Sequence, residues 1–314
     1  MGARLVSGLS FAVWHRIAPQ IMIENEEGGL TDRKFYPADE EAEFAETKAP
    51  STPQTRHPAY KLAFSDTDFL LRPELRPVRF QLELLKPEML LEEAGVGSTL
   101  VMYGSARIPP PEAVATAREG AEDLATLDRT VVRRLASKAK YYDEAYKLAR
   151  MVSEKGIIER GQRQFVVCSG GGPSIMEAAN KGASDAGAES IGLNIVLPHE
   201  QAPNPYVTPY LSFQFHYFAL RKMHFLLRAK AVAVFPGGFG TFDEFFELLT
   251  LVQTGKLKPI PILLFGHDFW TRVVDWDALV EEGVISPADI ELITWCETAD
   301  EAWGHIAEFY ELER

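Results

Sequence analysis

The feature that most constrains this chain is a strand, a glycine-rich turn and a helix between Ala231 and Thr254. Five apolar residues, too few for a helix, run from Ala231 to Phe235 and indicate a buried parallel strand. The sequence Pro236-Gly237-Gly238-Phe239-Gly240 ends this strand, and a helical pattern begins at Thr241. Glycines let the backbone approach a ligand closely, and the helix behind them presents unpaired N–H groups and the positive end of its dipole. The segment therefore predicts an anion-binding turn.

A second turn of the same design occurs earlier in the chain. The apolar run from Phe165 to Cys168 ends at Ser169-Gly170-Gly171-Gly172-Pro173, and a helical pattern follows from Ser174 to Ala186. Three successive glycines are more than a capped helix needs. They favour contact between backbone amides and a phosphate.

Strand and helix patterns alternate from Ser98 to the end of the chain. The other short apolar runs that indicate strands are Leu100 to Tyr103, Ser190 to Leu197, Tyr210 to Phe215, Ile260 to Phe265 and Ile290 to Trp295. Helical patterns cover Val131 to Lys155, Tyr217 to Lys230, Asp268 to Glu282 and Ala299 to Glu313. This alternation predicts an α/β fold with a doubly wound parallel sheet, covered by helices on both faces.

The N-terminal part of the chain differs from the rest. Residues 24–48 are rich in acids, and residues 49–57 carry two prolines among polar residues. The segment from Thr67 to Glu93 is helical in pattern and apolar enough to pack on the main domain or on a second subunit. We therefore predict a partly helical extension over residues 1–95 and a separate α/β domain over residues 96–314.

Composition excludes several classes of protein. The formal net charge of −13 argues against broad binding to nucleic acid. Cys168 and Cys296 are the only cysteines, and we expect both to be reduced, buried thiols of a cytoplasmic protein. No apolar run approaches the roughly 18 to 20 residues that span a bilayer.

Several common site signatures are missing from the sequence. Neither glycine turn fits G-x-G-x-x-G, and no acid is placed for a ribose after the following strand, which argues against a nicotinamide cofactor. The P-loop pattern, the G-x-S-x-G pattern and metal-ligand spacings are also missing. We expect a site without a metal or an organic cofactor.

Two glutamates after the glycine turns have alternative interpretations. Thr241 with Glu244, and Ser174 with Glu177, fit the S/T-x-x-E capping box, in which the glutamate accepts a hydrogen bond from the first backbone N–H of its helix. Alternatively, Glu244 faces a pocket at the carboxyl end of its strand and handles a proton or a developing positive charge. The two roles of Glu244 do not exclude each other.

Four ordered motifs resemble those of the Lonely guy (LOG) family of phosphoribohydrolases, which release cytokinin bases from their nucleotides. Pro236-Gly237-Gly238-Phe239-Gly240-Thr241-x-x-Glu244 matches the signature P-G-G-x-G-T-x-x-E, and Arg221-Lys222 matches the family's R-K pair. Tyr103-Gly104-Ser105 and Ser169 to Gly172 fit the two earlier turns. The resemblance covers about Ser98 to Arg314 and departs at Tyr217-Phe218, where the family has Met-His.

The resemblance implies a Rossmann-like fold, at least a homodimer, and cleavage of a nucleoside 5′-monophosphate to a free base and ribose 5-phosphate. It implies that Glu244 stabilises the oxocarbenium-like state and orients water, while Arg221 holds the nucleotide or assists the leaving base. It assigns substrate binding to Gly104, Ser105, Gly170, Gly171, Gly172, Met176, Glu177, Lys222, Gly237, Gly238, Gly240 and Thr241.

The resemblance leaves the reaction and the base open. The same superfamily holds purine nucleoside monophosphate nucleosidases and a molybdenum-cofactor carrier, so a non-catalytic binding protein is the alternative. A lysine decarboxylase label is common in the superfamily, but no Ser-x-His-Lys motif for a pyridoxal-type lysine occurs here. The aromatic residues Tyr217 and Phe218 favour an unmodified purine by shortening a slot for a prenyl group, although they could equally line such a slot.

Overall fold

The protein is described by a computed structural model that covers residues 37–120, 125–198 and 202–312. Contacts between Cα atoms divide the chain into two units, Met1–Pro73 and Glu74–Arg314. In the part of the first unit that is described, α1 spans Ala38–Thr47, a 3-10 helix spans Pro58–Tyr60 and α2 spans Thr67–Leu70. The second unit holds the sheet.

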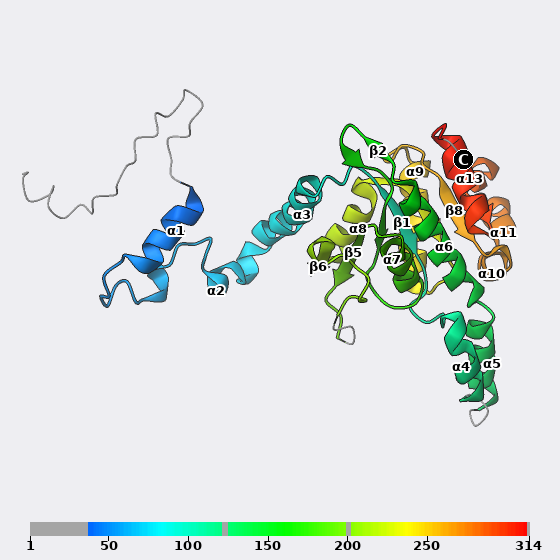
Figure 1. The fold of residues 1–314 in the computed structure, drawn as a ribbon, viewed down its shortest axis with the longest axis horizontal. Helices are drawn as coiled ribbons and strands as arrows, with labels where there is room; N and C mark the ends of the chain where they lie inside the picture. The colour runs from blue at the N-terminus through cyan, green and yellow to red at the C-terminus, as the bar shows by residue number, and fades with distance from the viewer. Residues whose placement is uncertain (1–36, 121–124, 199–201, 313–314) are drawn as a thin grey trace, which may run out of the picture. The chain divides into compact units, whose positions relative to one another are not determined.

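A seven-stranded, all-parallel sheet forms the centre of the second unit (Figure 1). Its order is β6-β5-β4-β1-β7-β8-β9. The strands are β1 (Thr99–Tyr103), β4 (Val166–Ser169), β5 (Ser190–Ile195), β6 (Ser212–Phe215), β7 (Ala229–Val234), β8 (Ile262–Phe265) and β9 (Thr294–Cys296). A separate antiparallel pair joins β2 (Ile158–Glu159) to β3 (Gln162–Arg163). The predicted α/β fold is confirmed.

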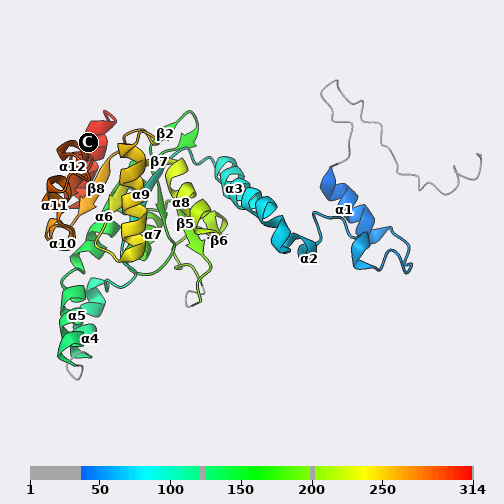
Figure 2. The same ribbon diagram turned by 180° about the vertical axis from the view of Figure 1, so that it is seen from behind.

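Helices cover both faces of the sheet, which is the doubly wound arrangement that the alternating pattern predicts. On one face, α6 (Lys140–Lys155), α7 (Ile175–Asp185) and α13 (Ala299–Phe309) share a hydrophobic core with Leu100 and Met102 of β1. On the other face, α8 (Phe218–Leu227) and α9 (Phe239–Gln253) pack on Val101 and Tyr103 (Figure 2). Because β1 is buried on both faces, its sequence is a continuous apolar run rather than an alternating one.

The order of the strands creates a switch point at the centre of the sheet. From β1 the chain proceeds outward through β4, β5 and β6, and then crosses back to pair β7 with the other edge of β1. The N–H of Ser105 donates to the carbonyl of Pro236 at 3.2 Å, which ties the loops after β1 and β7 together. Open α/β sheets place their ligands at such a point, beyond the carboxyl ends of the strands.

The boundary between the two units lies earlier than the predicted position at residue 95. Helix α3 (Arg76–Glu93) belongs to the second unit, where the side chain of Leu91 is buried in the core beside α8. The carboxylate of Glu83 accepts hydrogen bonds from the N–H groups of His216 and Tyr217 at 3.0 and 3.2 Å. The segment from Arg76 to Glu93 therefore packs on the sheet domain, one of the two arrangements that its apolar residues predict.

Two predicted helices are each divided in the structure. The stretch Val131 to Lys155 contains the end of α5 (Thr126–Ala136) and all of α6, and the stretch Asp268 to Glu282 contains α10 (His267–Val273) and α11 (Trp276–Glu281). The carboxylate of Asp275 accepts a hydrogen bond from the N–H of Ala278 and so begins α11. Periodicity does not reveal such breaks, because the apolar pattern continues across them.

The remaining elements differ from the predicted boundaries by a few residues. Helix α8 ends at Leu227, so Lys230 lies in β7, and the predicted strand from Ile290 to Trp295 is reduced to β9 because α12 (Pro287–Ile290) precedes it. The other short helices are α4 (Val114–Glu119) and the 3-10 helices Pro73–Leu75, Pro111–Ala113 and Pro209–Leu211. Within the described ranges, no helix combines the length and the apolar character needed to cross a bilayer.

Candidate active site

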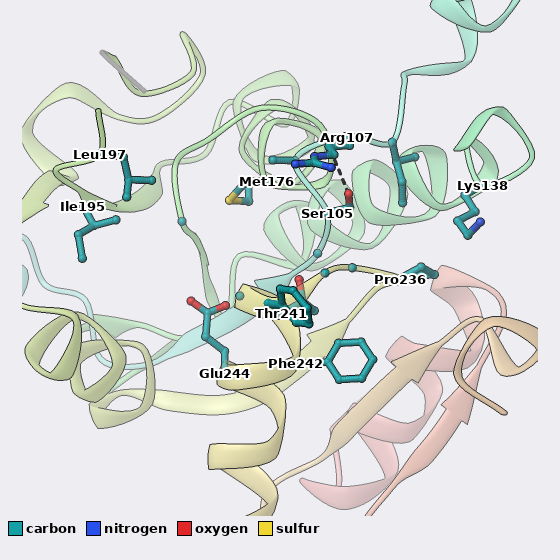
Figure 3. Close-up of a pocket in the computed structure, with 18 of the residues that line it drawn as sticks. Ser105, Arg107, Lys138, Met176, Ile195, Leu197, Pro236, Thr241, Phe242 and Glu244 are labelled. Atoms are coloured by element: carbon teal, nitrogen blue, oxygen red, sulfur yellow. Dashed lines mark hydrogen bonds between the residues drawn. The ribbon is translucent and has the colours of Figure 1, made fainter. Parts of the chain in front are cut away.

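A pocket of about 790 Å³ opens at the switch point of the sheet (Figure 3). Its walls come from the loops after β1, β4 and β7, with further residues from β5, α8 and the end of α5. Ten of the predicted site residues line it: Gly104, Ser105, Gly170, Met176, Arg221, Gly237, Gly238, Gly240, Thr241 and Glu244. Segments that are far apart in the sequence therefore meet at one site.

The glycine turn after β7 is open on the pocket side. Helix α9 begins at Phe239 rather than at the predicted Thr241, and Gly238 is its N-cap residue. A Cβ atom added to Gly238 or Gly240 would meet no atom within 4 Å, and the side chain of Phe239 is 97% exposed. The first N–H groups of the helix have no partner within the helix and face this opening. The turn can bind an anion without rearrangement.

The capping interpretation of Glu244 is wrong. Because α9 begins at Phe239, Thr241 already lies inside the helix, and no side chain caps its first turn. Glu244 therefore lies in the second turn of α9, where its side chain is only 14% exposed and lines the pocket. The capping box predicted for Ser174 and Glu177 is also absent, since the Ser174 hydroxyl donates to the carbonyl of Ile108 at 2.5 Å.

Glu244 and Arg221 form a buried ion pair at the floor of the pocket. Nη1 of Arg221 donates to Oε1 of Glu244 at 3.4 Å. The pKa of Glu244 is raised to about 7, first by burial and then by the negative charge of Asp243, while Arg221 opposes this rise. A carboxyl group with this pKa exchanges its proton near neutral pH, as acid–base catalysis requires.

Contacts on three sides fix the guanidinium of Arg221. Its Nε donates to the carbonyl of Leu193 at 2.6 Å, and the group lies 5.1 Å from the centre of the Phe225 ring. An added Cβ at Gly170 would lie 2.6 Å from Nη2 of Arg221 and 2.7 Å from Sδ of Met176. A side chain at position 170 would therefore shift the guanidinium of Arg221 or the thioether of Met176.

The second glycine turn is only partly exposed to the pocket. Gly170 lines the pocket, but Gly171 and Gly172 do not. The N–H of Gly171 donates to Oγ of Ser169 at 3.0 Å, and the carbonyls of Gly171 and Gly172 accept from Asn204. The structure therefore does not support the prediction that the amides of all three glycines face a phosphate, since a buried network holds this turn.

Two further predicted binding residues lie outside the pocket lining. Glu177 accepts a hydrogen bond from the hydroxyl of Tyr142 at 3.4 Å. Lys222 forms ion pairs with Asp243 and Glu247, both at 2.9 Å. On these contacts, Glu177 and Lys222 are supporting groups. Lys222 also lowers the pKa of Glu244 through its charge.

The sequence analysis missed several lining residues, although it had considered Phe218. Ile195, Leu197 and Phe218 are the apolar wall of the pocket, and Arg107, Lys138 and Phe269 also line it. In Figure 3, Ile195 and Leu197 lie on one side of Glu244 and Lys138 lies on the other. Leu197 ends a predicted strand, and Arg107 and Phe269 follow predicted strands, so that position was a usable signal. Lys138 and Leu135 carried no such signal, because only the packing of α5 brings them to the site.

Comparison with known proteins shows which proteins this chain resembles. Residues 176–306 match the model of a family described as possible lysine decarboxylase. The chain is 26% identical over 181 residues to the probable cytokinin riboside 5′-monophosphate phosphoribohydrolase LOGL3 of Oryza sativa subsp. japonica, which covers 55% of this chain and 79% of that protein. It is 27% identical over 175 residues to LOG3 of Arabidopsis thaliana, with 55% and 77% covered.

The chain is therefore similar to the LOG phosphoribohydrolases over its sheet domain. Solved structures also resemble this chain. TM1055 shares 20% identity with a TM-score of 0.43, over 67% of this chain and 99% of that one. The molybdenum cofactor carrier protein MCP of Chlamydomonas reinhardtii shares 18% identity with a TM-score of 0.37, over 55% and 88%.

The site of this chain combines three chemical functions. Backbone amides and the hydroxyl of Thr241 can bind an anion, an apolar wall can hold an aromatic base, and the Glu244–Arg221 pair lies between them. Among the residues that the structure describes, no group of three or more His, Cys, Asp or Glu side chains is placed to hold a metal ion.

Proposed function

We propose that this chain is a nucleoside 5′-monophosphate phosphoribohydrolase that releases a free purine base and ribose 5-phosphate. The observation that carries the proposal is the position of Glu244, a buried carboxyl group on the floor of the pocket, one helical turn beyond an open anion-binding turn. The LOG relatives named above are phosphoribohydrolases, and this activity agrees with that chemistry.

The order of groups along the pocket fits a bound nucleotide. The 5′-phosphate would lie at the glycine turn, where the amides of α9 and the hydroxyl of Thr241 can donate to it. The ribose would then lie over Glu244, and the base would lie against Ile195, Leu197 and Phe218. In Figure 3 the labelled residues follow this sequence, from Ile195 and Leu197 past Glu244 to Thr241.

Cleavage of the N-ribosidic bond places positive charge on the ribose ring. An ionised Glu244 beneath the anomeric carbon stabilises this charge and orients the attacking water, as carboxylates do in glycoside hydrolysis. Arg221 holds the carboxylate in place and can donate a hydrogen bond to the substrate. The proton that leaves with the base comes from water in this scheme, because Glu244 acts in its ionised form.

The direct test is incubation of the protein with AMP and with isopentenyl-AMP, followed by chromatography for free base and ribose 5-phosphate. Release of either base supports the proposal. Binding of these nucleotides without release of base from any common nucleotide would overturn it, and the chain would then be a nucleotide-binding protein.

The proposal predicts a pH dependence of kcat/KM. Because the pKa of Glu244 is raised to about 7 and the ionised form is active, kcat/KM should rise with pH through about 7. Asp243 raises this pKa, so Asp243→Asn should move the rising limb to lower pH. Initial rates at low AMP concentration measure the profile. If kcat/KM falls instead as the pH rises through this range, Glu244 acts as a general acid.

The apolar wall predicts a modest discrimination between purine nucleotides. We expect AMP to be at least as good a substrate as isopentenyl-AMP, with kcat/KM values that differ by less than about a hundredfold. Phe218→Ala should improve the prenylated nucleotide relative to AMP if the ring of Phe218 shortens the slot. Tyr217→Leu is the control, because Tyr217 packs on Phe80 with ring centres 4.0 Å apart and does not line the pocket. A preference above a hundredfold for isopentenyl-AMP would contradict this prediction.

A further inference from the structure

The pocket continues beyond the glycine turn to a second end with a different character. Lys138, just after α5, lines this end together with Leu135, Ile108 and Phe269, and Arg107 lines it from the loop after β1. In Figure 3, Lys138 lies on the far side of Thr241 from Ile195 and Leu197, and Arg107 lies above Thr241 beside Ser105. A nucleoside monophosphate in the orientation proposed above leaves this end unused.

The two cations at this end are not neutralised by carboxylates. Nζ of Lys138 donates to the carbonyl of Arg134 at 2.8 Å and lies 5.7 Å from the centre of the Phe269 ring. Within the described part of the chain, neither Lys138 nor Arg107 forms a salt bridge, whereas Arg221, Lys222 and the nearby Lys140 each have a carboxylate partner. Lys138 is thus held in place by neutral groups and keeps donors available for a ligand.

The surroundings of Lys138 add positive charge. Burial lowers the pKa of Lys138, and the guanidinium groups of Arg134 and Arg272 lower it further. Among the residues that the structure describes, Glu244 is the one acid that lines the pocket, and it is already paired with Arg221. In a chain of net charge −13, such an uncompensated positive cluster at a pocket wall favours binding of an anion.

We propose that Arg107 and Lys138 form a second anion subsite, which binds a phosphate group in addition to the phosphate at the glycine turn. The inference deepens the proposed function and rests on it for the placement of the nucleotide. The second group is either the β-phosphate of a nucleoside diphosphate or a free inorganic phosphate bound beside a monophosphate. The pocket has room for it, since 790 Å³ lies in the upper part of the range of about 300 to 1,000 Å³ for small-molecule sites.

Calorimetric titration of a Glu244→Gln protein with AMP and ADP tests the subsite without turnover. We expect ADP to bind about tenfold more tightly than AMP, because one charge-assisted contact of ordinary strength produces that ratio. Lys138→Met in the same background should remove the advantage of ADP and change the affinity for AMP by less than about threefold. Lys140→Met is the matched control and should retain the advantage, because Lys140 is paired with Glu297 and does not line the pocket.

A second variant and a second titration test the subsite independently of Lys138→Met. Arg107 is exposed, so Arg107→Gln does not endanger folding and should also reduce the advantage of ADP. Titration of AMP in the presence of inorganic phosphate distinguishes the two sources. If free phosphate occupies the subsite, it should bind without displacing AMP, and it should no longer bind to the Lys138→Met protein. Two results would overturn the proposal. One is equal affinity for AMP and ADP together with no binding of free phosphate beside AMP. The other is an equal loss of affinity for both nucleotides in Lys138→Met.

The outcome is independent of the proposed reaction. If the protein binds ADP more tightly than AMP but the wild-type chain releases no base, the phosphoribohydrolase proposal fails and the subsite stands. If base is released but Lys138 does not increase the affinity for ADP over that for AMP, the subsite proposal fails and the proposed reaction stands.

Discussion

Replacement of Glu244 by glutamine should lower kcat for nucleotide cleavage by about 10²- to 10⁴-fold. Glutamine keeps the size of the side chain and can still accept a hydrogen bond from Arg221, but it cannot provide the negative charge that stabilises an oxocarbenium-like state. Affinity for AMP should change little, because the phosphate and the base bind elsewhere in the pocket. Single-turnover rates and calorimetric titration separate these two effects.

Glu247→Gln is the matched control for this experiment. Glu247 lies on the same helix, is paired with Lys222 at 2.9 Å and does not line the pocket. Its charge also raises the pKa of Glu244, so kcat is compared at pH 8, where Glu244 is ionised and Glu247→Gln should leave kcat unchanged. Because burial raises the pKa of Glu244, ionisation of this carboxyl group destabilises the folded state at pH values above the pKa that the group has in the unfolded chain. Glu244→Gln should therefore keep its thermal midpoint at pH 8. Equal activity of the wild-type and Glu244→Gln proteins would remove Glu244 from the mechanism.

Gly182→Ala should cause the largest loss of stability among conservative changes in the core. Gly182 is buried where α7 crosses α6, and an added Cβ would clash with the carbonyl oxygen of Tyr146 and lie 3.0 Å from both Cβ of Ala149 and N of Arg150. Because backbone atoms cannot move aside as a flexible side chain can, we expect a cost of about 3 kcal/mol. For a unit of this size, the thermal midpoint should then fall by about 6 to 12 °C.

Gly304→Ala provides the comparison for this loss. Gly304 lies inside helix α13, and an added Cβ would meet no atom within 4 Å. Alanine is favoured over glycine inside a helix, so this change should stabilise the protein by about 0.5 to 1 kcal/mol. The same substitution thus has opposite signs at the two positions. A stabilised Gly182→Ala protein in thermal or urea unfolding would show that α6 and α7 are less tightly packed than the structure indicates.

The sequence alone determined the architecture of the sheet domain and the chemistry at its centre. Strands such as β1 and β7 are buried on both faces, and their uninterrupted apolar runs can be recognised without knowledge of their neighbours. The glycine turn at Pro236 is likewise a local signal, because the backbone geometry it permits depends on residue type. These two signals pointed to Glu244, whereas Arg221 was selected by the resemblance to the LOG family.

Tertiary packing decided what local patterns could not. A glutamate three residues after a threonine can either cap a helix or face a pocket. Only the start of α9 at Phe239 showed that Glu244 does not cap the helix. Packing of α3 on α8 moved the boundary of the extension to Pro73, although the apolar stripe of α3 had allowed a second subunit as its partner. Lys138 lines the pocket because α5 ends beside α10, and the contacts between these distant segments depend on the whole fold rather than on the residues next to Lys138 in sequence.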